Sequence, residues 1–65
     1  GGISMPNIFI EMIEGRTVEQ KQLLAEQITK VTADILQLDP EIITIRFLDN
    51  KRENLAKGGK LYLYR

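Results

Sequence analysis

The stretch NIFIEMIEGRTVEQ, residues 7–20, decides the fold class, because a strand, a turn and a helix start follow one another in it. Apolar side chains alternate through residues 7–13, which is the period of a strand. One side of this strand carries Ile8, Ile10 and Met12, and the other carries Asn7, Phe9, Glu11 and Ile13. Gly15 follows directly and predicts a turn.

A helix is predicted to begin at Thr17. Thr17 and Gln20 fit a capping box, in which each side chain satisfies a backbone N–H of the other residue. An apolar stripe follows with the 3.6-residue period, formed by Leu24, Ile28, Val31, Ile35 and Leu38. The opposite face carries Lys21, Glu26, Lys30, Asp34 and Gln37. Pro40 ends the helix, because the residue before a proline disfavours the helical region.

Two further extended segments follow the helix. Residues 42–48 alternate and predict a second strand, and residues 60–64 alternate again and predict a short terminal strand or hairpin. Gly58 and Gly59 permit a tight turn before the last segment.

This order predicts an α+β subunit of β-α-β type. A helix between two strands requires a right-handed crossover and therefore a parallel strand pair. One helix covers only one face of the pair, yet both strands carry apolar residues on both faces. We therefore expect an oligomer, in which a second subunit buries the other face and the terminal strand pairs across a subunit boundary.

Composition narrows the possible chemistry. The chain has 65 residues and contains no Cys, no His and no Trp. Disulfides, thiol nucleophiles, imidazole bases and Cys or His metal sites are therefore excluded. The groups that remain available for catalysis are carboxylates, Arg, Lys, Tyr and a chain terminus. A domain this short buries only about 60% of its unfolded surface, which also favours oligomerisation.

The net charge of zero hides an asymmetry along the chain. Residues 1–50 hold four basic and eight acidic side chains, a net of −4, whereas residues 51–65 hold five basic and one acidic, a net of +4. We favour a tail that complements an acidic surface of its own or a neighbouring subunit over a basic patch for a polyanion. No nucleic acid is expected as a partner. No apolar run reaches the roughly 20 residues of a membrane span and no signal peptide is present, so a cytoplasmic protein without membrane contact is expected.

The chain resembles the 4-oxalocrotonate tautomerase family. The resemblance is carried by Met5-Pro6, by Glu14-Gly15-Arg16-Thr17-Val18-Glu19-Gln20-Lys21 and by Gly58-Gly59, and it extends from residue 5 to about residue 63. It implies β-α-β subunits assembled into a hexamer, usually a trimer of dimers. It also implies an enzyme without a cofactor, whose N-terminal proline moves a proton between carbon positions of an enol or unsaturated keto acid.

Two segments of different origin are expected. Gly1-Gly2-Ile3-Ser4 directly before Met5 has the pattern of a cloning remnant, so we expect residues 1–4 to be an expression scar. Residues 5–65 would then form a single tautomerase-like domain that begins at Met5. Removal of Met5 in the cell would leave Pro6 with a free secondary amine.

Pro6 is the candidate catalytic base. An α-amino group has an ordinary pKa of about 7.7–8.0, and an apolar pocket or a nearby cation such as Arg16 would lower it towards neutrality. A base of that strength suits proton abstraction. The alternative is that Pro6 merely starts an edge strand. The physical argument alone favours this alternative, whereas the resemblance to the family favours the catalytic role. While Pro6 is joined to Met5 by an amide, we expect normal folding without this activity.

The remaining candidates follow from the resemblance. It makes Arg16 the residue that binds a substrate carboxylate, a task suited to the fork of a guanidinium, whereas the alternative is a solvated loop arginine. The family's second catalytic arginine, from a neighbouring subunit, falls at Thr44, which has no charge. Arg46 lies about 6.6 Å further along the same strand face and either replaces that arginine or serves a salt bridge. The family's pocket aromatic falls at Leu55.

The sequence leaves two candidate functions. The first is a tautomerase or isomerase of small unsaturated 2-keto or enol carboxylic acids, with itself and a small anionic substrate as its partners. The second is a non-catalytic or weakly active oligomeric relative that binds ligands or serves a structural role. Thr44 and Leu55 motivate the second function, and they place a dicarboxylate substrate in doubt.

Overall fold

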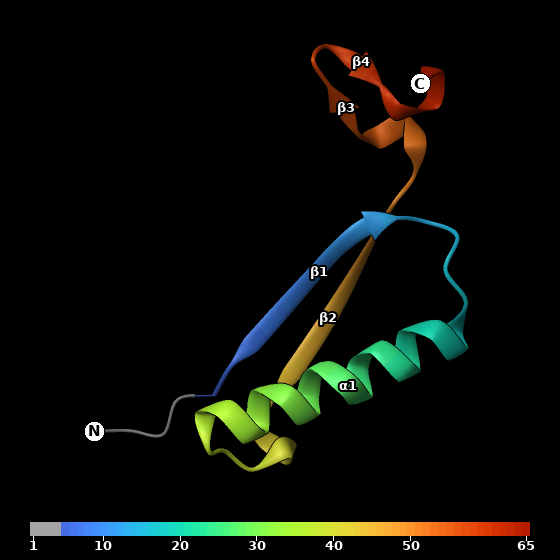
Figure 1. Ribbon diagram of the computed structural model, residues 1–65. Helices are drawn as coiled ribbons and strands as arrows, with labels where there is room; N and C mark the ends of the chain where they lie inside the picture. The colour runs from blue at the N-terminus through green and yellow to red at the C-terminus, as the bar shows by residue number, and fades with distance from the viewer. Residues whose placement is uncertain (1–4) are drawn as a thin grey trace.

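The fold is a two-layer β-α-β unit from which a C-terminal hairpin extends (Figure 1). The computed structural model describes residues 5–65, so the expected scar at residues 1–4 lies outside the described residues. The main elements are strand β1 (Asn7–Ile13), helix α1 (Val18–Leu36), strand β2 (Thr44–Asn50) and the hairpin strands β3 (Ala56–Lys57) and β4 (Lys60–Leu61). Short 3-10 helices span Pro40–Ile42, Arg52–Asn54 and Tyr62–Tyr64. The predicted fold class is confirmed.

The two long strands pair in parallel along their whole length. The register runs from Asn7 opposite Thr44 to Ile13 opposite Asn50. One further bond closes the start of the ladder, where the backbone N–H of Thr44 donates to the carbonyl of Pro6 at 3.1 Å. At the other end, the side-chain amide of Asn50 donates to Oε1 of Glu11 at 3.1 Å. Pro6 is therefore fixed beside the first residue of β2.

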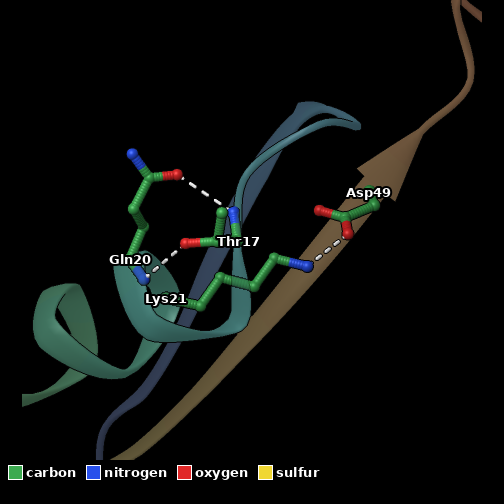
Figure 2. A network of polar contacts seen from close by, with 4 residues as sticks. All are labelled: Thr17, Gln20, Lys21 and Asp49. Atoms are coloured by element: carbon green, nitrogen blue, oxygen red, sulfur yellow. Dashed lines mark hydrogen bonds and ion pairs between the residues drawn. The ribbon is translucent and has the colours of Figure 1, made fainter.

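Helix α1 begins as predicted. The Thr17 hydroxyl accepts from the backbone N–H of Gln20 at 3.0 Å, and the Gln20 side chain accepts from the backbone N–H of Thr17 at 3.0 Å (Figure 2). Both halves of the capping box are thus present. The helix ends at Leu36, and Gln37 caps it in a left-handed conformation with φ of 57°. The predicted stop ahead of Pro40 is confirmed.

Thr17→Ala is expected to lower the free energy of unfolding by about 1 kcal/mol, because it leaves the Gln20 N–H without its acceptor. Urea denaturation at a fixed protein concentration measures this loss. Thr17→Ser, which keeps a hydroxyl at the cap, serves as the control and should retain most of the stability. An equal loss in both variants would contradict the capping argument.

The apolar stripe of α1 mostly does not face its own sheet. Leu24, Val31 and Ile35 are 38%, 51% and 73% exposed. Lys21, expected on the outer face, instead reaches β2 and pairs with Asp49 (Figure 2). Helical periodicity identifies an apolar stripe but cannot tell whether it covers the chain's own sheet or a partner's. The expected orientation of Lys21 was wrong for this reason.

Two segment boundaries also differ from the prediction. The second strand was expected at residues 42–48 but begins at Thr44, because Pro40–Ile42 form a 3-10 turn capped by the Asp39 carboxylate. The terminal strand was expected at residues 60–64 but ends at Leu61, where a 3-10 turn follows. The glycine turn is confirmed, since Gly58 and Gly59 both have positive φ, of 60° and 79°.

A single copy leaves much of its surface open. The radius of gyration is 15.3 Å, against about 10.7 Å for a compact chain of 65 residues. The exposed area of 5348 Å² exceeds the roughly 4,200 Å² expected at this mass. Among the residues described, Ala33, at 8% exposed, is the one buried hydrophobic side chain. Phe9 and Leu48 remain exposed on the sheet face that α1 does not cover.

Candidate active site

Pro6 lies at the start of β1 and is half-buried. Its nearest partner across the sheet is Thr44, whose backbone N–H donates to the Pro6 carbonyl. The resemblance places Thr44 of a neighbouring subunit in the candidate site, whereas the contact seen here is made by the backbone of Thr44 of the same chain. The side chain of Thr44 adds a neutral hydroxyl, not a charge, to this end of the sheet.

Arg16 lies at the opposite end of β1, in the turn that leads to α1 (Figure 1). Gly15 makes this turn possible with a φ of 127°, a conformation that favours glycine. The strand between the two candidates has seven residues, and the six steps between them, of about 3.3 Å each, span about 20 Å. Pro6 and Arg16 of one chain therefore do not meet.

Arg46 is the cation nearest to Pro6 along the sheet. It stands opposite Phe9 in the register, and its guanidinium carbon lies 5.6 Å from the centre of the Phe9 ring. This is within the range of a cation–π contact. Within residues 5–65 Arg46 forms no salt bridge. The structure thus gives Arg46 an aromatic partner that the sequence alternatives did not include.

Leu55 lies on the C-terminal arm, which we define as residues 51–65. Its side chain is half-buried and its carbonyl accepts from the Tyr62 N–H at 2.8 Å. The arm leaves the sheet after Asn50, which is opposite Ile13 (Figure 1). Leu55 therefore lies beyond the same end of the sheet as Arg16 and far from Pro6 of its own chain.

A hollow of about 440 Å³ adjoins Arg16, between the end of β1 and the first turns of α1. Its apolar lining comes from Met12, Leu23 and Leu24. Its cations are Arg16 and Lys21, and Lys21 is paired with Asp49. We call this the Arg16 hollow. Sequence reasoning missed both the hollow and the ion pair, because Lys21 and Asp49 are 28 positions apart and no local pattern links them.

In residues 5–65, no three acidic side chains come together as a metal site would require. None of the helices in the same range is long and apolar enough to cross a bilayer.

Comparison with known proteins adds the decisive observation. A family model described as a tautomerase enzyme matches residues 6–62. The chain belongs to the tautomerase family. The match begins at Pro6 and includes Arg16, Thr44, Arg46 and Leu55, so every candidate lies within the family's domain.

Individual relatives support the same family assignment. A probable tautomerase of Bacillus cereus is 36% identical over 56 residues, which cover 86% of this chain and 92% of the relative. A 2-hydroxymuconate tautomerase of Bacillus subtilis is 32% identical, over 86% of this chain and 90% of the relative. A solved 4-oxalocrotonate tautomerase isozyme structure from Methylibium petroleiphilum superimposes with a TM-score of 0.86 at 30% identity, covering 92% and 94% of the two chains.

Proposed function

We propose that this protein is a tautomerase or isomerase of small unsaturated 2-keto or enol carboxylic acids, and that Pro6 is its general base and acid. The observation that carries the proposal is the tautomerase match beginning at Pro6. In a chain without His or Cys, a free proline amine is the group that titrates near neutrality without a large shift.

The proposed reaction needs no cofactor. The Pro6 amine accepts a proton from an enol oxygen or a carbon of the substrate and returns it to another carbon. Arg16 binds the substrate carboxylate with its guanidinium fork and stabilises the negative charge that develops on the enolate oxygen. Met5 must be absent for this step, because an amide nitrogen does not accept the proton.

The site proposed for this reaction is shared between two copies of the chain. Pro6 and Arg16 lie at opposite ends of β1, and β1 has a free edge because its sheet consists of β1 and β2 within the described residues. Two β1 edges that pair antiparallel about a two-fold axis would place Pro6 of one copy beside Arg16 of the partner subunit. The same pairing would bring the exposed apolar flanks of the two helices to one side of the joined sheet.

Charge and open surface support self-association as well. The arm carries a net charge of +4 and the remainder of the chain −4. In the part of the chain that the structure describes, the ion pair found is Lys21 with Asp49, so the arm's cations are not paired within their own copy. The acidic surface of another copy is the partner we propose for them. The hexamer implied by the resemblance is the assembly we expect.

The test is turnover by the chain that begins at Pro6. Ketonisation of a panel of simple enol acids is followed by ultraviolet absorbance, and Met5 removal is checked by mass. We expect the processed protein to be faster than its Pro6→Ala variant on at least one acid. If it is no faster on any of them, the enzyme proposal fails and the ligand-binding or structural alternative is favoured.

A further inference from the structure

Arg46 carries a positive charge that has no carboxylate partner in its own copy. Its side chain is exposed, and within residues 5–65 it forms no ion pair. Its guanidinium carbon lies 5.6 Å from the centre of the Phe9 ring, which stands opposite it on β1. Within the described residues β1 pairs with β2 on one side, and its other edge is free. The guanidinium therefore lies over Phe9, between β2 and the free edge of β1.

Glu11 carries the matching negative charge on the same face of the sheet. This is the face that α1 does not cover, and it presents the odd-numbered residues of β1 and the even-numbered residues of β2. Among these residues Glu11 and Arg46 are the two that carry a charge. The Asn50 amide donates to Oε1 of Glu11 at 3.1 Å, whereas Oε2 accepts no hydrogen bond within residues 5–65. The second carboxylate oxygen is therefore open to a donor from another copy.

Geometry restricts the registers in which two β1 edges can pair about a two-fold axis. When both helices lie on one side of the joined sheet, the odd-numbered β1 residues of both copies share a face. Directly opposite residues of antiparallel strands also share a face, so their numbers must be both odd or both even. The register centred on Ile10 meets this condition and pairs all seven residues of β1 with the partner's seven. Registers centred on Phe9 or Glu11 pair fewer residues, and the latter sets two carboxylates opposite each other.

The Ile10 register sets Glu11 of the partner subunit opposite Phe9. Arg46, Phe9 and the partner's Glu11 then lie in one row across the joined sheet, because Arg46 is already opposite Phe9. The Cα atoms of Arg46 and the partner's Glu11 are two strand spacings apart, about 9.6 Å, a distance that the two long side chains bridge together. The two-fold axis repeats this row, so each pair of copies contains it twice.

We propose that Arg46 forms an ion pair with Glu11 of the partner subunit, and that this ion pair fixes the register in which two copies join. The guanidinium donates to the open carboxylate oxygen, and the ion pair covers the Phe9 ring, which is 60% exposed in one copy. The inference rests on the shared site of the proposed function, because the same register brings Pro6 to within two residue positions of the partner's Arg16. Arg46 is thereby assigned to assembly and not to the substrate.

A mixture of two charge-reversal variants tests the proposal. Glu11→Arg and Arg46→Glu each set like charges against each other when the variant pairs with itself, so each alone should assemble more weakly than the unsubstituted chain. A mixed pair of copies has opposite charges at both places. After co-refolding of chains that begin at Pro6, mixed pairs should outnumber each unmixed pair about tenfold, against about twofold for random assembly. Native mass spectrometry measures the composition, and larger assemblies should hold the two variants in equal numbers.

Two outcomes of the mixing experiment overturn the proposal. One is a random distribution, because charges that pair within one copy, or not at all, gain nothing from mixing. The other is the same preference in a control mixture of Glu26→Arg and Lys30→Glu. These substitutions make equal changes of charge at exposed positions of α1, so the control should assemble at random.

Neutral variants cover the case in which charge reversal prevents assembly. Arg46→Gln and Glu11→Gln should each raise the dissociation constant of the assembly by about fivefold. The double variant should raise it little further, because both substitutions remove the same ion pairs. Sedimentation equilibrium measures the three constants. Additive effects, or unchanged assembly with a lower kcat/KM in Arg46→Gln, would show that Arg46 does not bind the partner's Glu11.

Turnover of enol acids, measured on the same samples, separates this inference from the proposed function. Preferred mixed assembly without turnover by the unsubstituted chain would refute the proposed function and leave the ion pair in place. Turnover by the unsubstituted chain with random mixing of the charge-reversal variants would refute the ion pair and leave the proposed function in place.

Discussion

A chain that retains Met5 is expected to catalyse proton transfer about 10²–10⁴-fold more slowly than the same chain beginning at Pro6. In the longer chain the Pro6 nitrogen belongs to a tertiary amide, whose lone pair is delocalised into the carbonyl. It therefore cannot accept a proton near neutral pH. The measurement compares initial rates of ketonisation for the two forms at equal concentration and pH.

The rates of the two forms can be compared directly because the fold does not depend on the Pro6 nitrogen. Strand β1 begins at Asn7, and Pro6 joins the ladder through its carbonyl, which accepts from Thr44. Both forms should give the same circular dichroism spectrum and the same number of subunits in the native assembly. Pro6→Ala keeps an α-amino group and should lie between the two rates. Similar rates in the blocked and free forms would show that the Pro6 nitrogen is not the base.

The elements that could be predicted from the sequence are those whose signals are local. The strand at Asn7–Ile13 follows from alternation, and the helix start at Thr17 follows from a capping box whose partners are three residues apart. The start of β2 was misplaced because Pro40 favours a 3-10 turn, which competes with the alternating pattern of Ile42 and Ile43. The alternating pattern alone does not show which of these two preferences prevails, so it could not predict the first residue of β2.

The candidate site was only partly predictable, because its parts depend on distant pairings. The resemblance pointed to Pro6 and Arg16, and the predicted strand at residues 7–13 already placed them at its opposite ends. The ion pair of Lys21 with Asp49 connects α1 to β2. The stacking of Arg46 on Phe9 connects β2 to β1. Such contacts arise from register and helix orientation.

Arg16→Gln is expected to lower kcat/KM by about 10²–10³-fold on the best enol acid, because it removes the donors to the carboxylate and the developing enolate. Stability should change little, since Arg16 is exposed and forms no ion pair within residues 5–65. Lys30→Gln removes the same charge from another flank of α1 and should leave the rate close to that of the unsubstituted protein. Equal losses in both variants would indicate a general charge effect instead of a role for Arg16.

Mixing the two impaired variants, Pro6→Ala and Arg16→Gln, tests whether the site is shared. In an oligomer of equal parts Pro6→Ala and Arg16→Gln, a site that combines Pro6 of one copy with Arg16 of the partner subunit is intact in about a quarter of cases. Co-refolded mixtures should therefore recover about a quarter of the unsubstituted rate, whereas the separately refolded variants, assayed together, should show only the sum of their own residual rates. The separation of about 20 Å along β1 requires this result if both residues act on one substrate. No recovery in mixtures that native mass spectrometry shows to be mixed would mean that Pro6 and Arg16 do not form one site.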